Sequence, residues 1–369
     1  MDFVDSSKLN RNFYVPAFAI KVGKNDLLDK RVEVFGVTVN NTLEGADDFS
    51  FTVNNPFNAS RTEFKYLENK FFDVGKEVKI KVGYGDRSKL PTILHGIITS
   101  LDVSFPSNGI SQLTVKGFDF SHKMMKGKDS KTWGSDNRPI KYSDIVKEIA
   151  TRPEYGFKVS NVENTLEEHP QVKQKNESDY DFIKKKLANE ISYEVFVIGK
   201  DFYFRPRANT KSEVVTTLQW GQTLISFTPE INTADQVNEV EVRGWNPARQ
   251  KAIVGKASQG QEQGRDGGRK TGSDVMASIQ KQVINHVWQP VFSKKEADDI
   301  AKSILEKTAL EFVKGNGECI GLPGIMPGKN IELRGLGETF SKIYYIEKAT
   351  HTVSTSGYKT TFSVKENSI

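Results

Sequence analysis

The sequence of 369 residues predicts a mainly β fold of the α+β class, with two similar antiparallel β-barrels and two smaller inserted domains. Three observations support this fold class. Apolar and polar residues alternate along much of the N-terminal and C-terminal thirds, which is typical of half-buried strands. One hairpin pattern occurs twice. Helical patterns are confined to two segments between the strand-rich stretches.

The first barrel is predicted over residues 1–119. Its alternating apolar positions are Val32, Val34, Phe49, Phe51, Val53, Val78, Ile80 and Val82. A long strand over 93–105 and a last strand over 110–120 follow, separated by a turn. An antiparallel sheet of this length can close into a barrel.

Residues 120–208 are predicted to form an α/β insertion domain. Ser178 and Asp181 match a capping box at the start of a helix. The buried face of that helix is Tyr180, Ile183 and Leu187. A hairpin over 191–206 follows, with its turn at Gly199 and Lys200.

The second barrel is predicted over residues 209–245 and 308–369, interrupted by a flexible loop plus helix insertion over 246–307. The loop, 258–273, is rich in glycine, glutamine and charged residues, so we expect it to lack fixed structure. Ser293 and Glu296 match the capping box of the helix that follows. Its buried stripe is Ala297, Ile300 and Ile304.

The repeated hairpin reads VGKEVKIKVGYGD over 74–86 and PGKNIELRGLGE over 327–338. Alignment on the shared Gly-Lys places Val78 and Ile80 over Ile331 and Leu333. Each copy continues through a charged turn, a long strand, a turn with serine and glycine, and a last strand. This order indicates a duplicated barrel. The alternative is that two unrelated hairpins share common turn residues.

Composition limits the class of protein. No segment reaches the ~20 consecutive apolar residues of a membrane helix, and Asp2, Asp5 and Arg11 interrupt any signal-peptide pattern. The net charge is +5, and the basic runs lack clustered aromatic residues. Cys319 is the only cysteine, which excludes an internal disulfide and a cysteine metal cluster. We therefore expect no membrane partner and no sequence-specific nucleic-acid binding.

Three segments together resemble the tail-hub proteins of contractile phages, namely the late control protein D family, and the N-terminal hub part of type VI secretion VgrG proteins. The segments are NESDYDFIKKKLANEISYEVFVIGKDFYFRP over 176–206, LQWGQTLISFTPEINTADQVNEVEVRGWNP over 218–247, and the C-terminal stretch over 321–367. The first barrel resembles that family only in its pattern of strands.

The resemblance implies tail-tube-like barrels in a baseplate hub of a phage tail, tailocin or contractile injection particle. Such a hub is a homotrimer that joins the hexameric tail tube protein to the trimeric central spike protein, beside baseplate wedge or adaptor proteins. Its lumen passes DNA or cargo, and it is a structural protein of the virion or particle, assembled in the bacterial cytoplasm. Because no spike repeat or lysozyme module precedes Ile369, we expect a separate spike protein. The tail-tip hub of a non-contractile tail is the related alternative.

We expect no catalytic, cofactor-binding or metal-binding residues. The histidines show no metal-ligand spacing; they are His95, His122, His169, His286 and His351. GKASQG over 255–260 misses the G-x-S-x-G pattern by one residue. GRDGGRKT over 264–271 has Arg269 where a phosphate-binding loop requires glycine.

A peptidoglycan-cleaving baseplate enzyme is the alternative from a different class. Its carboxylate pair would be Glu167 with Glu168, or Asp179 with Asp181. The aspartates are explained by the start of a helix, where negative charge is stabilised, and the glutamates lie in a polar connection. The tryptophans either fill cores or anchor interfaces; they are Trp133, Trp220, Trp245 and Trp288.

Overall fold

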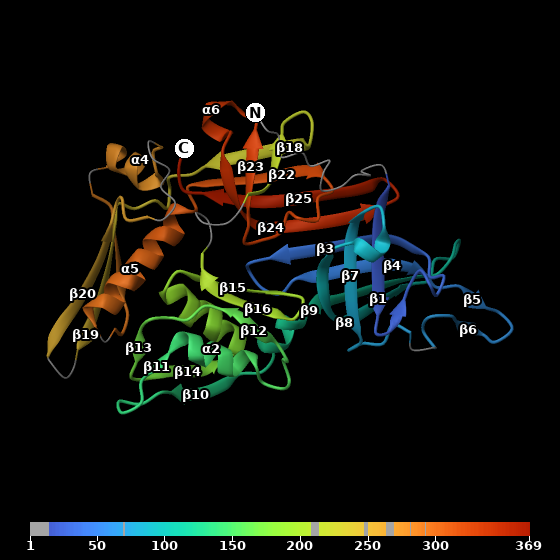
Figure 1. Ribbon diagram of the computed structural model, residues 1–369, viewed down its shortest axis with the longest axis horizontal. Helices are drawn as coiled ribbons and strands as arrows, with labels where there is room; N and C mark the ends of the chain where they lie inside the picture. Colours follow the sequence, from blue (N-terminus) through green and yellow to red (C-terminus); the bar gives the residue numbers. More distant parts are fainter. Residues whose placement is uncertain are drawn as a thin grey trace.

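The computed structural model describes residues 15–68, 71–207, 214–246, 250–262, 269–280, 282–291 and 293–369. The molecule is elongated, and one large curled sheet runs along its length (Figure 1). Two insertions that contain helices lie toward one end of this sheet. Within the described ranges, no helix is long and apolar enough to cross a bilayer.

The N-terminal part of the large sheet forms the first unit. Its main strands are β1 (Pro16–Val22), β3 (Val34–Thr42), β4 (Asp48–Asn54), β7 (Glu77–Tyr84), β8 (Thr92–Ser104) and β9 (Gln112–Asp119). They lie side by side in the order β3-β4-β9-β8-β7-β1. The short β2 (Asn25–Asp26) ends the sheet, and β5 (Phe57–Asn58) pairs with β6 (Glu63–Phe64) outside it. Alternate residues of the main strands form one core, as expected for strands with one buried face.

The C-terminal part of the sheet forms the second unit. Its strands are β17 (Val214–Gln219), β18 (Leu224–Ile231), β22 (Val313–Ile320), β23 (Asn330–Arg334), β24 (Ile343–Ser354) and β25 (Gly357–Glu366). They lie in the order β18-β22-β25-β24-β23-β17, which is the order of the first unit. The turns η1 (Arg87–Lys89) and α6 (Gly337–Phe340) also occupy equivalent places. One difference is that β17 runs parallel to β23, whereas β1 runs antiparallel to β7.

The two units match down to their β-bulges. The register shifts between Ile98 and Ser100 in β8, and between Ile346 and Lys348 in β24. A second pair of shifts lies between Val34 and Gly36 in β3, and between Leu224 and Ser226 in β18. Counting from these bulges places Val78 and Ile80 over Ile331 and Leu333, as predicted. The predicted fold class of two similar antiparallel β units with smaller insertions is therefore confirmed.

The two units are joined into a single sheet of 13 strands. The junction is an antiparallel pairing of β24 with β3, from Lys348 opposite Thr42 to Val353 opposite Val37. Sequence patterns did not predict this junction, because its strands lie far apart in the chain and each also has a partner within its own unit.

The α/β insertion follows β9 and has its own core. Its elements are η2 (Phe120–Met125), β10 (Asp129–Trp133), β11 (Ile140–Lys141), α2 (Tyr142–Ala150), β12 (Lys158–Val162), β13 (Glu168–His169), β14 (Val172–Glu177), α3 (Asp179–Asp181), η3 (Phe182–Ala188), β15 (Tyr193–Ile198) and β16 (Asp201–Pro206). The predicted cap is present, since the Asp181 N–H donates to the Ser178 hydroxyl at 3.1 Å. The predicted helix differs in one respect, because η3 is a π-helix rather than an α-helix. Its wider turn brings Phe182, Ile183, Leu187 and Ala188 into the core.

The second insertion separates β18 from β22. Its elements are β19 (Glu239–Asn246), β20 (Lys251–Ser258), α4 (Gly272–Ile279), β21 (Ile284–Trp288) and α5 (Lys294–Ala309). The strands form a separate sheet in the order β20-β19-β21, with α5 packed on one face. The predicted cap of α5 is present, since the Glu296 N–H donates to the Ser293 hydroxyl at 3.1 Å. The predicted boundary at residue 245 assigns β19 to the second barrel, whereas β19 pairs only with β20 and β21 among the described strands.

The predicted flexible loop, 258–273, differs from expectation at its two ends. Residues 263–268 of this loop lie outside the described residues. At the described ends, Glu262, Thr271 and Ser273 are buried, and Thr271 forms a complete capping box with Asp274 at the start of α4. The Lys270 and Ile369 backbones also exchange hydrogen bonds, of 2.9 and 3.1 Å. Polar composition predicted disorder here because hydrogen bonds to distant segments leave no pattern in a local window.

Candidate functional site

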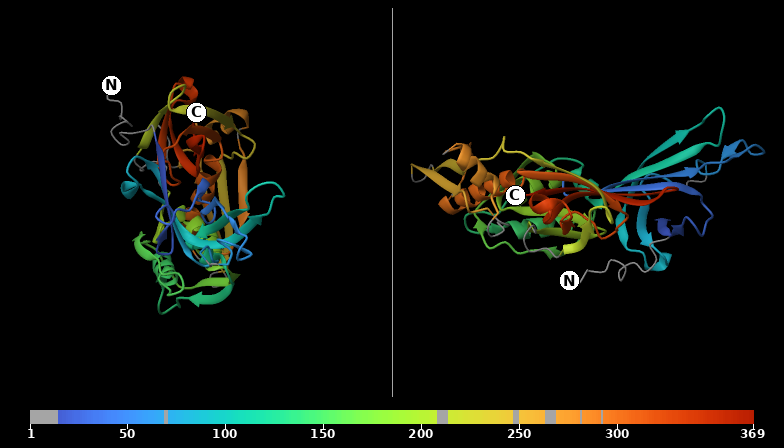
Figure 2. Two further views of the ribbon diagram at one scale, coloured as in Figure 1. Left: turned by 90° about the vertical axis from the view of Figure 1, so that its right-hand side faces the viewer. Right: turned by 90° about the horizontal axis from the view of Figure 1, so that it is seen from above.

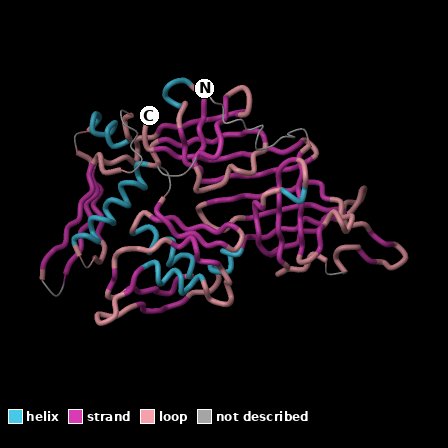
Figure 3. The backbone as a smooth tube through the Cα atoms, viewed as in Figure 1, coloured by secondary structure: helices cyan, strands magenta, loops and turns pink. Residues whose placement is uncertain are grey.

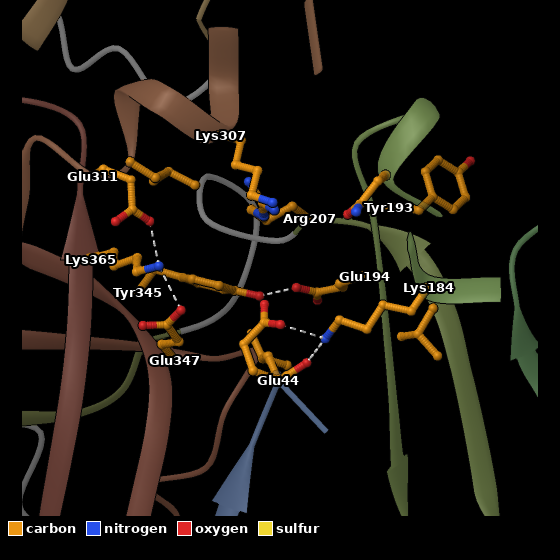
Figure 4. A pocket seen from close by; sticks show the side chains of 14 residues that line it. Glu44, Lys184, Tyr193, Glu194, Arg207, Lys307, Glu311, Tyr345, Glu347 and Lys365 are labelled. Atoms are coloured by element: carbon orange, nitrogen blue, oxygen red, sulfur yellow. Dashed lines mark hydrogen bonds and ion pairs between the residues drawn. The ribbon is translucent and has the colours of Figure 1, made fainter. Parts of the chain in front are cut away.

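A small pocket lies where both units of the sheet meet both insertions (Figure 4). Its polar lining residues are Glu44, Lys184, Asn189, Tyr193, Glu194, Arg207, Lys307, Glu311, Tyr345, Glu347 and Lys365. The cavity volume is about 60 Å³. That volume holds a few water molecules, whereas ligand pockets usually enclose about 300 Å³ or more. The interactions in the pocket are therefore the hydrogen bonds and ion pairs among its own side chains.

Glu194 on β15 connects the α/β insertion to the second unit. The residue is 7% exposed, and its carboxylate accepts hydrogen bonds from the Tyr345 hydroxyl on β24 and from Arg205 Nε at 2.9 Å. Arg205 Nη2 also donates to the Gly328 carbonyl at 2.8 Å. Burial raises the pKa of Glu194 and of Tyr345. The phenol therefore stays protonated and remains a donor to the carboxylate.

Lys184 on η3 connects the same insertion to the first unit. Its ammonium group donates to the Leu43 carbonyl and lies 3.3 Å from the Glu44 carboxylate, both in the turn after β3. Burial lowers the pKa of Lys184. Tyr180 reaches the same turn, because its hydroxyl accepts from the Gly45 N–H and donates to the Gly45 carbonyl, each at 3.1 Å.

Lys365 on β25 is held between two carboxylates, those of Glu311 just after α5 and Glu347 on β24, each at 2.6 Å. Burial opposes its charge, but the two carboxylates outweigh that effect and raise the pKa of the lysine. A further contact ties the two insertions together, since the Ser303 hydroxyl on α5 donates to the Asn189 carbonyl. The pocket thus links all four parts of the molecule.

This arrangement suits a role in positioning the parts of the molecule. The Glu194, Glu311 and Glu347 carboxylates are each engaged by a tyrosine, arginine or lysine. Such buried ionic contacts add little net stability, but each demands one geometry because a displaced partner leaves a buried charge unpaired. The site therefore fixes how the insertions sit on the sheet.

A second buried group lies at the end of the same turn, where Asp47 and Asp119 approach each other. Asp47 accepts from Asn41 Nδ2 at 2.6 Å and from the Thr42 N–H at 2.8 Å. Asp119 accepts from the Ser121 N–H at 2.9 Å. Burial raises the pKa of Asp119 to about 6 and that of Asp47 well above its ordinary value. Neither aspartate stands out in the sequence, because an aspartate next to a strand end usually belongs to an exposed turn.

His351 is a core residue of the second unit. Its Nε2 lies 3.0 Å from the Ile325 carbonyl and therefore donates, and its Nδ1 accepts from the Tyr358 hydroxyl at 2.8 Å. Burial lowers the pKa of His351 to about 4. The other histidines lie apart, beside Glu77 (His95), Phe118 (His122), Tyr142 (His169) and Glu241 (His286). The part of the chain that the structure describes contains no group of three or more potential metal ligands.

The carboxylates considered for catalysis have separate partners. Glu167 pairs with Lys295 on α5, and Glu168 is exposed on β13. Asp181 pairs with Lys185 at 2.9 Å. Asp179 has a larger role than its place at a helix start predicts. Its buried carboxylate accepts from Arg152 Nη1 at 2.6 Å, from the Tyr155 hydroxyl at 2.7 Å and from Gln174 Nε2 at 2.9 Å.

The remaining sequence motifs have structural roles where they fall within the described residues. In GKASQG, Gly255 belongs to β20 and lies directly against α5, so the segment does not form a strand-to-helix elbow. In GRDGGRKT, Gly264 to Gly268 lie outside the described residues, and Thr271 caps α4. Of the tryptophans, Trp133 fills the core of the α/β insertion, whereas Trp220, Trp245 and Trp288 are exposed.

Comparison with solved structures shows that this fold recurs in tail proteins. The 43 kDa tail protein of prophage MuSo2 from Shewanella oneidensis is similar, with a TM-score of 0.70 and 10% identity, over 95% of this chain and 98% of that one. A tail protein from Neisseria meningitidis MC58 has a TM-score of 0.68 and 13% identity, over 96% and 97%. The E. coli c3393 protein, a component of the type VI secretion system, has a TM-score of 0.56 and 14% identity, over 94% and 76%.

The resemblance to tail-hub proteins is thus confirmed by the fold. No curated protein sequence matches this chain. One family model does match, and it covers residues 14–355 under the description Alg8 N-terminal domain. The match spans the first unit, both insertions and the second unit as far as the end of β24, so this chain belongs to the Alg8 N-terminal domain family.

Proposed function

We propose that this protein is a structural baseplate hub, a homotrimer that joins a hexameric tail tube to a trimeric central spike. It acts in a contractile phage tail, a tailocin or an injection particle, assembles in the bacterial cytoplasm, and contacts baseplate wedge or adaptor proteins. Its lumen passes DNA or cargo. The chain itself performs no catalysis. The division into barrels over 1–119 and over 209–245 with 308–369 remains part of this proposal, except that β19 belongs to the second insertion.

The observation that carries the proposal is the duplicated unit within one chain. The units share their strand order and both pairs of bulges, so they present similar surfaces. Three chains in a ring would present six such units while keeping threefold symmetry. One face can then match a sixfold tube and the other a threefold spike. The shared fold of the prophage tail proteins and the type VI component supports this proposal.

The geometry of the central pocket also supports a structural role. A connecting protein has to hold its parts in one arrangement, and the contacts of Glu194, Lys184 and Lys365 tie both insertions to both units. The cavity at this junction has a volume of about 60 Å³, which is smaller than ligand pockets usually are.

The test is the native mass of the purified chain, followed by imaging of the particles by electron microscopy. We expect a species of three times 41.4 kDa whose ring shows approximate sixfold symmetry in projection. A chain that stays monomeric at every concentration, alone and with its tube and spike proteins, contradicts the proposal. Release of peptidoglycan fragments that Glu167→Gln abolishes would favour an enzyme instead.

A further inference from the structure

The matched bulges give a residue-by-residue correspondence between the units. Counting from the bulges in β8 and β24, Leu101 corresponds to Ala349 and Val103 to His351. Counting from the bulges in β3 and β18, Val37 corresponds to Phe227. The pairing of a strand edge in one unit can therefore be used to predict the pairing of the equivalent edge in the other unit.

The junction within the chain uses one edge of each unit. The C-terminal half of β24 pairs with β25 on one side and with β3 on the other. β3 in turn pairs with β4 on its remaining side. The strands equivalent to β24 and β3 are β8 and β18, and these belong to opposite units.

Both equivalent edges lack a partner among the described residues. From Ser100 to Ser104, β8 pairs with β9 alone, and β18 ends the large sheet and pairs with β22 alone. The C-terminal half of β8 extends beyond β7, while β9 stays paired with β4 as far as Gln112, so only the outer edge of β8 is free (Figure 2). Unpaired strand edges are sites where another chain can add a strand.

The exposure of equivalent side chains also indicates that a partner could cover the free edges. Val353 is 4% exposed at the junction within the chain, whereas its counterpart Phe105, beside the free edge of β8, is 60% exposed. Asn41 is 2% exposed on β3, whereas its counterpart Ile231 on β18 is 43% exposed. The free edges thus leave apolar side chains in water at positions that are covered in the other unit.

We propose that β18 of one copy pairs antiparallel with β8 of the next copy, in the register that β3 and β24 adopt within one chain. This inference rests on the proposed trimeric hub and names the interface that would build it. The predicted register places Leu101 opposite Ile231 and Val103 opposite Pro229. The contact is head-to-tail, so successive copies close into a ring in which junctions within a chain alternate with junctions between chains.

Pro229 shapes this edge. By its equivalence to Val39, its backbone faces outward, and proline has no N–H to donate. The interface therefore lacks one hydrogen bond that the junction within the chain contains. A proline on an edge strand also discourages pairing with unrelated strands, so a free copy would be protected until a matching edge arrives.

The register also places two acidic side chains opposite each other, Asp102 of one copy and Glu230 of the next. Their counterparts within the chain are Thr350 and Asn40, which are hydrogen-bonded at 2.8 Å. Like charges directly across a strand pair oppose association. Glu230→Gln should therefore strengthen the trimer, by roughly twofold at each interface, without placing a second positive charge opposite Lys314 on β22.

The decisive experiment is a pair of engineered cysteines, Asp102→Cys with Glu230→Cys. This pair occupies a non-hydrogen-bonded position of the predicted ladder, where the Cα atoms approach to about 4.5 Å and a disulfide can form. Cys319, the native cysteine, is buried and its pKa is raised, so it does not compete. We expect mild oxidation to convert the double variant to a covalent trimer on a non-reducing gel.

The matched control is Asp102→Cys with Ile231→Cys, which moves the second cysteine to the opposite face of the same strand. It should not cross-link, and neither should either single variant. A native trimer that fails to cross-link through 102 and 230, or that cross-links equally well through 102 and 231, overturns this interface but leaves the hub intact. A chain that is monomeric at every concentration overturns both.

Discussion

At the residue scale, burial decides the protonation of His351. In the fold its pKa is lowered to about 4, whereas its ordinary value is 6.5. Between these values the unfolded chain binds a proton that the folded chain does not. The stability that His351 contributes is therefore present above pH 6.5 and is lost as the pH falls toward 4.

We expect His351→Gln to flatten this pH dependence. The wild type should lose roughly 3 kcal/mol more than the variant between pH 7 and pH 4. Urea unfolding at several pH values measures the difference. His286→Gln is the control, because that side chain is half exposed on the second insertion. Equal slopes for wild type and His351→Gln would contradict this account.

The contribution of Asp119 to stability changes with pH in the opposite direction. Burial raises its pKa from 3.8 to about 6, so the folded chain holds a proton that the unfolded chain has lost. Its contribution to stability is present below pH 3.8 and is lost as the pH rises through 6. Near neutral pH the fold therefore carries a buried charge.

Asp119→Asn should stabilise the protein above pH 7 by about 2 kcal/mol, because the amide oxygen can still accept from the Ser121 N–H without the charge. The two proteins should be about equally stable at pH 4. Thermal unfolding at both pH values measures the gain. Asp129→Asn, an exposed aspartate that accepts from the Ser130 N–H, should change little. A loss of stability at neutral pH would refute the assignment.

At the element scale, the contact between β15 and β24 depends on one phenol. Tyr345→Phe removes the hydroxyl that donates to the buried Glu194, which then retains Arg205 alone. We expect a cost of about 2 kcal/mol in the free energy of unfolding. The matched control is Tyr193→Phe, which lines the same pocket (Figure 4). Equal effects of the two substitutions in chemical denaturation would contradict the role of the phenol.

The two units fill their cores with aromatic residues on different strands. In the first unit Phe51 on β4 faces Val115 on β9, and in the second Gly317 on β22 faces Phe362 on β25. A Cβ atom at Gly317 would lie 2.4 Å from the Phe362 ring. The larger side chain of the facing pair thus lies on the other strand in the second unit, while the combined side-chain volume of the pair stays similar.

Gly317→Ala should therefore destabilise the protein by about 2 kcal/mol, since the added methyl overpacks the core. Combining it with Phe362→Val should cost less than the sum of the single changes, and a double-mutant cycle measures this coupling. Gly324→Ala is the control, because its Cβ would meet nothing within 4 Å. Additive effects would show that the two positions do not exchange volume.

These exchanges explain how far the sequence could predict the fold. Val78 and Ile80 were matched to Ile331 and Leu333 because both hairpins carry bulky apolar residues at the same positions. The match between Phe51 and Gly317 could not be predicted from the sequence. Side-chain volume is similar for the facing pairs Phe51–Val115 and Gly317–Phe362, but it differs at each single position. The similar segments LTVK over 113–116 and FSVK over 362–365 would align Lys116 with Lys365, whereas the bulges align Lys116 with Ser363, two residues earlier.

The candidate site was less predictable than the fold. Lys184 lies in a run of three lysines, a pattern that is typical of a solvated face, yet its partly buried ammonium group donates to the Leu43 carbonyl. Glu194 and Tyr345 lie far apart in the chain, and no local window shows that they meet. Capping by Ser178 and Ser293 was predicted correctly because those contacts span three residues.

At the scale of the whole molecule, the shared sheet and the central pocket couple the two units. We expect them to unfold in one transition, because the β24–β3 ladder and the contacts of Lys184 and Glu194 would be lost together. Hydrogen exchange in β4 and β22 measures this, and the protection of both strands should collapse at the same denaturant concentration. Two well-separated collapses would show that the units are independent.

Both units lie on one chain and share one sheet through β24 and β3 (Figure 3), so any assembly of this protein contains them in equal numbers. In the head-to-tail ring that we propose, the two units also alternate. A substitution in one unit then changes every second position of a closed ring and leaves its neighbours as they were. A single gene can in this way specialise alternate positions for different neighbours, while the covalent bond between the units keeps their ratio at one to one.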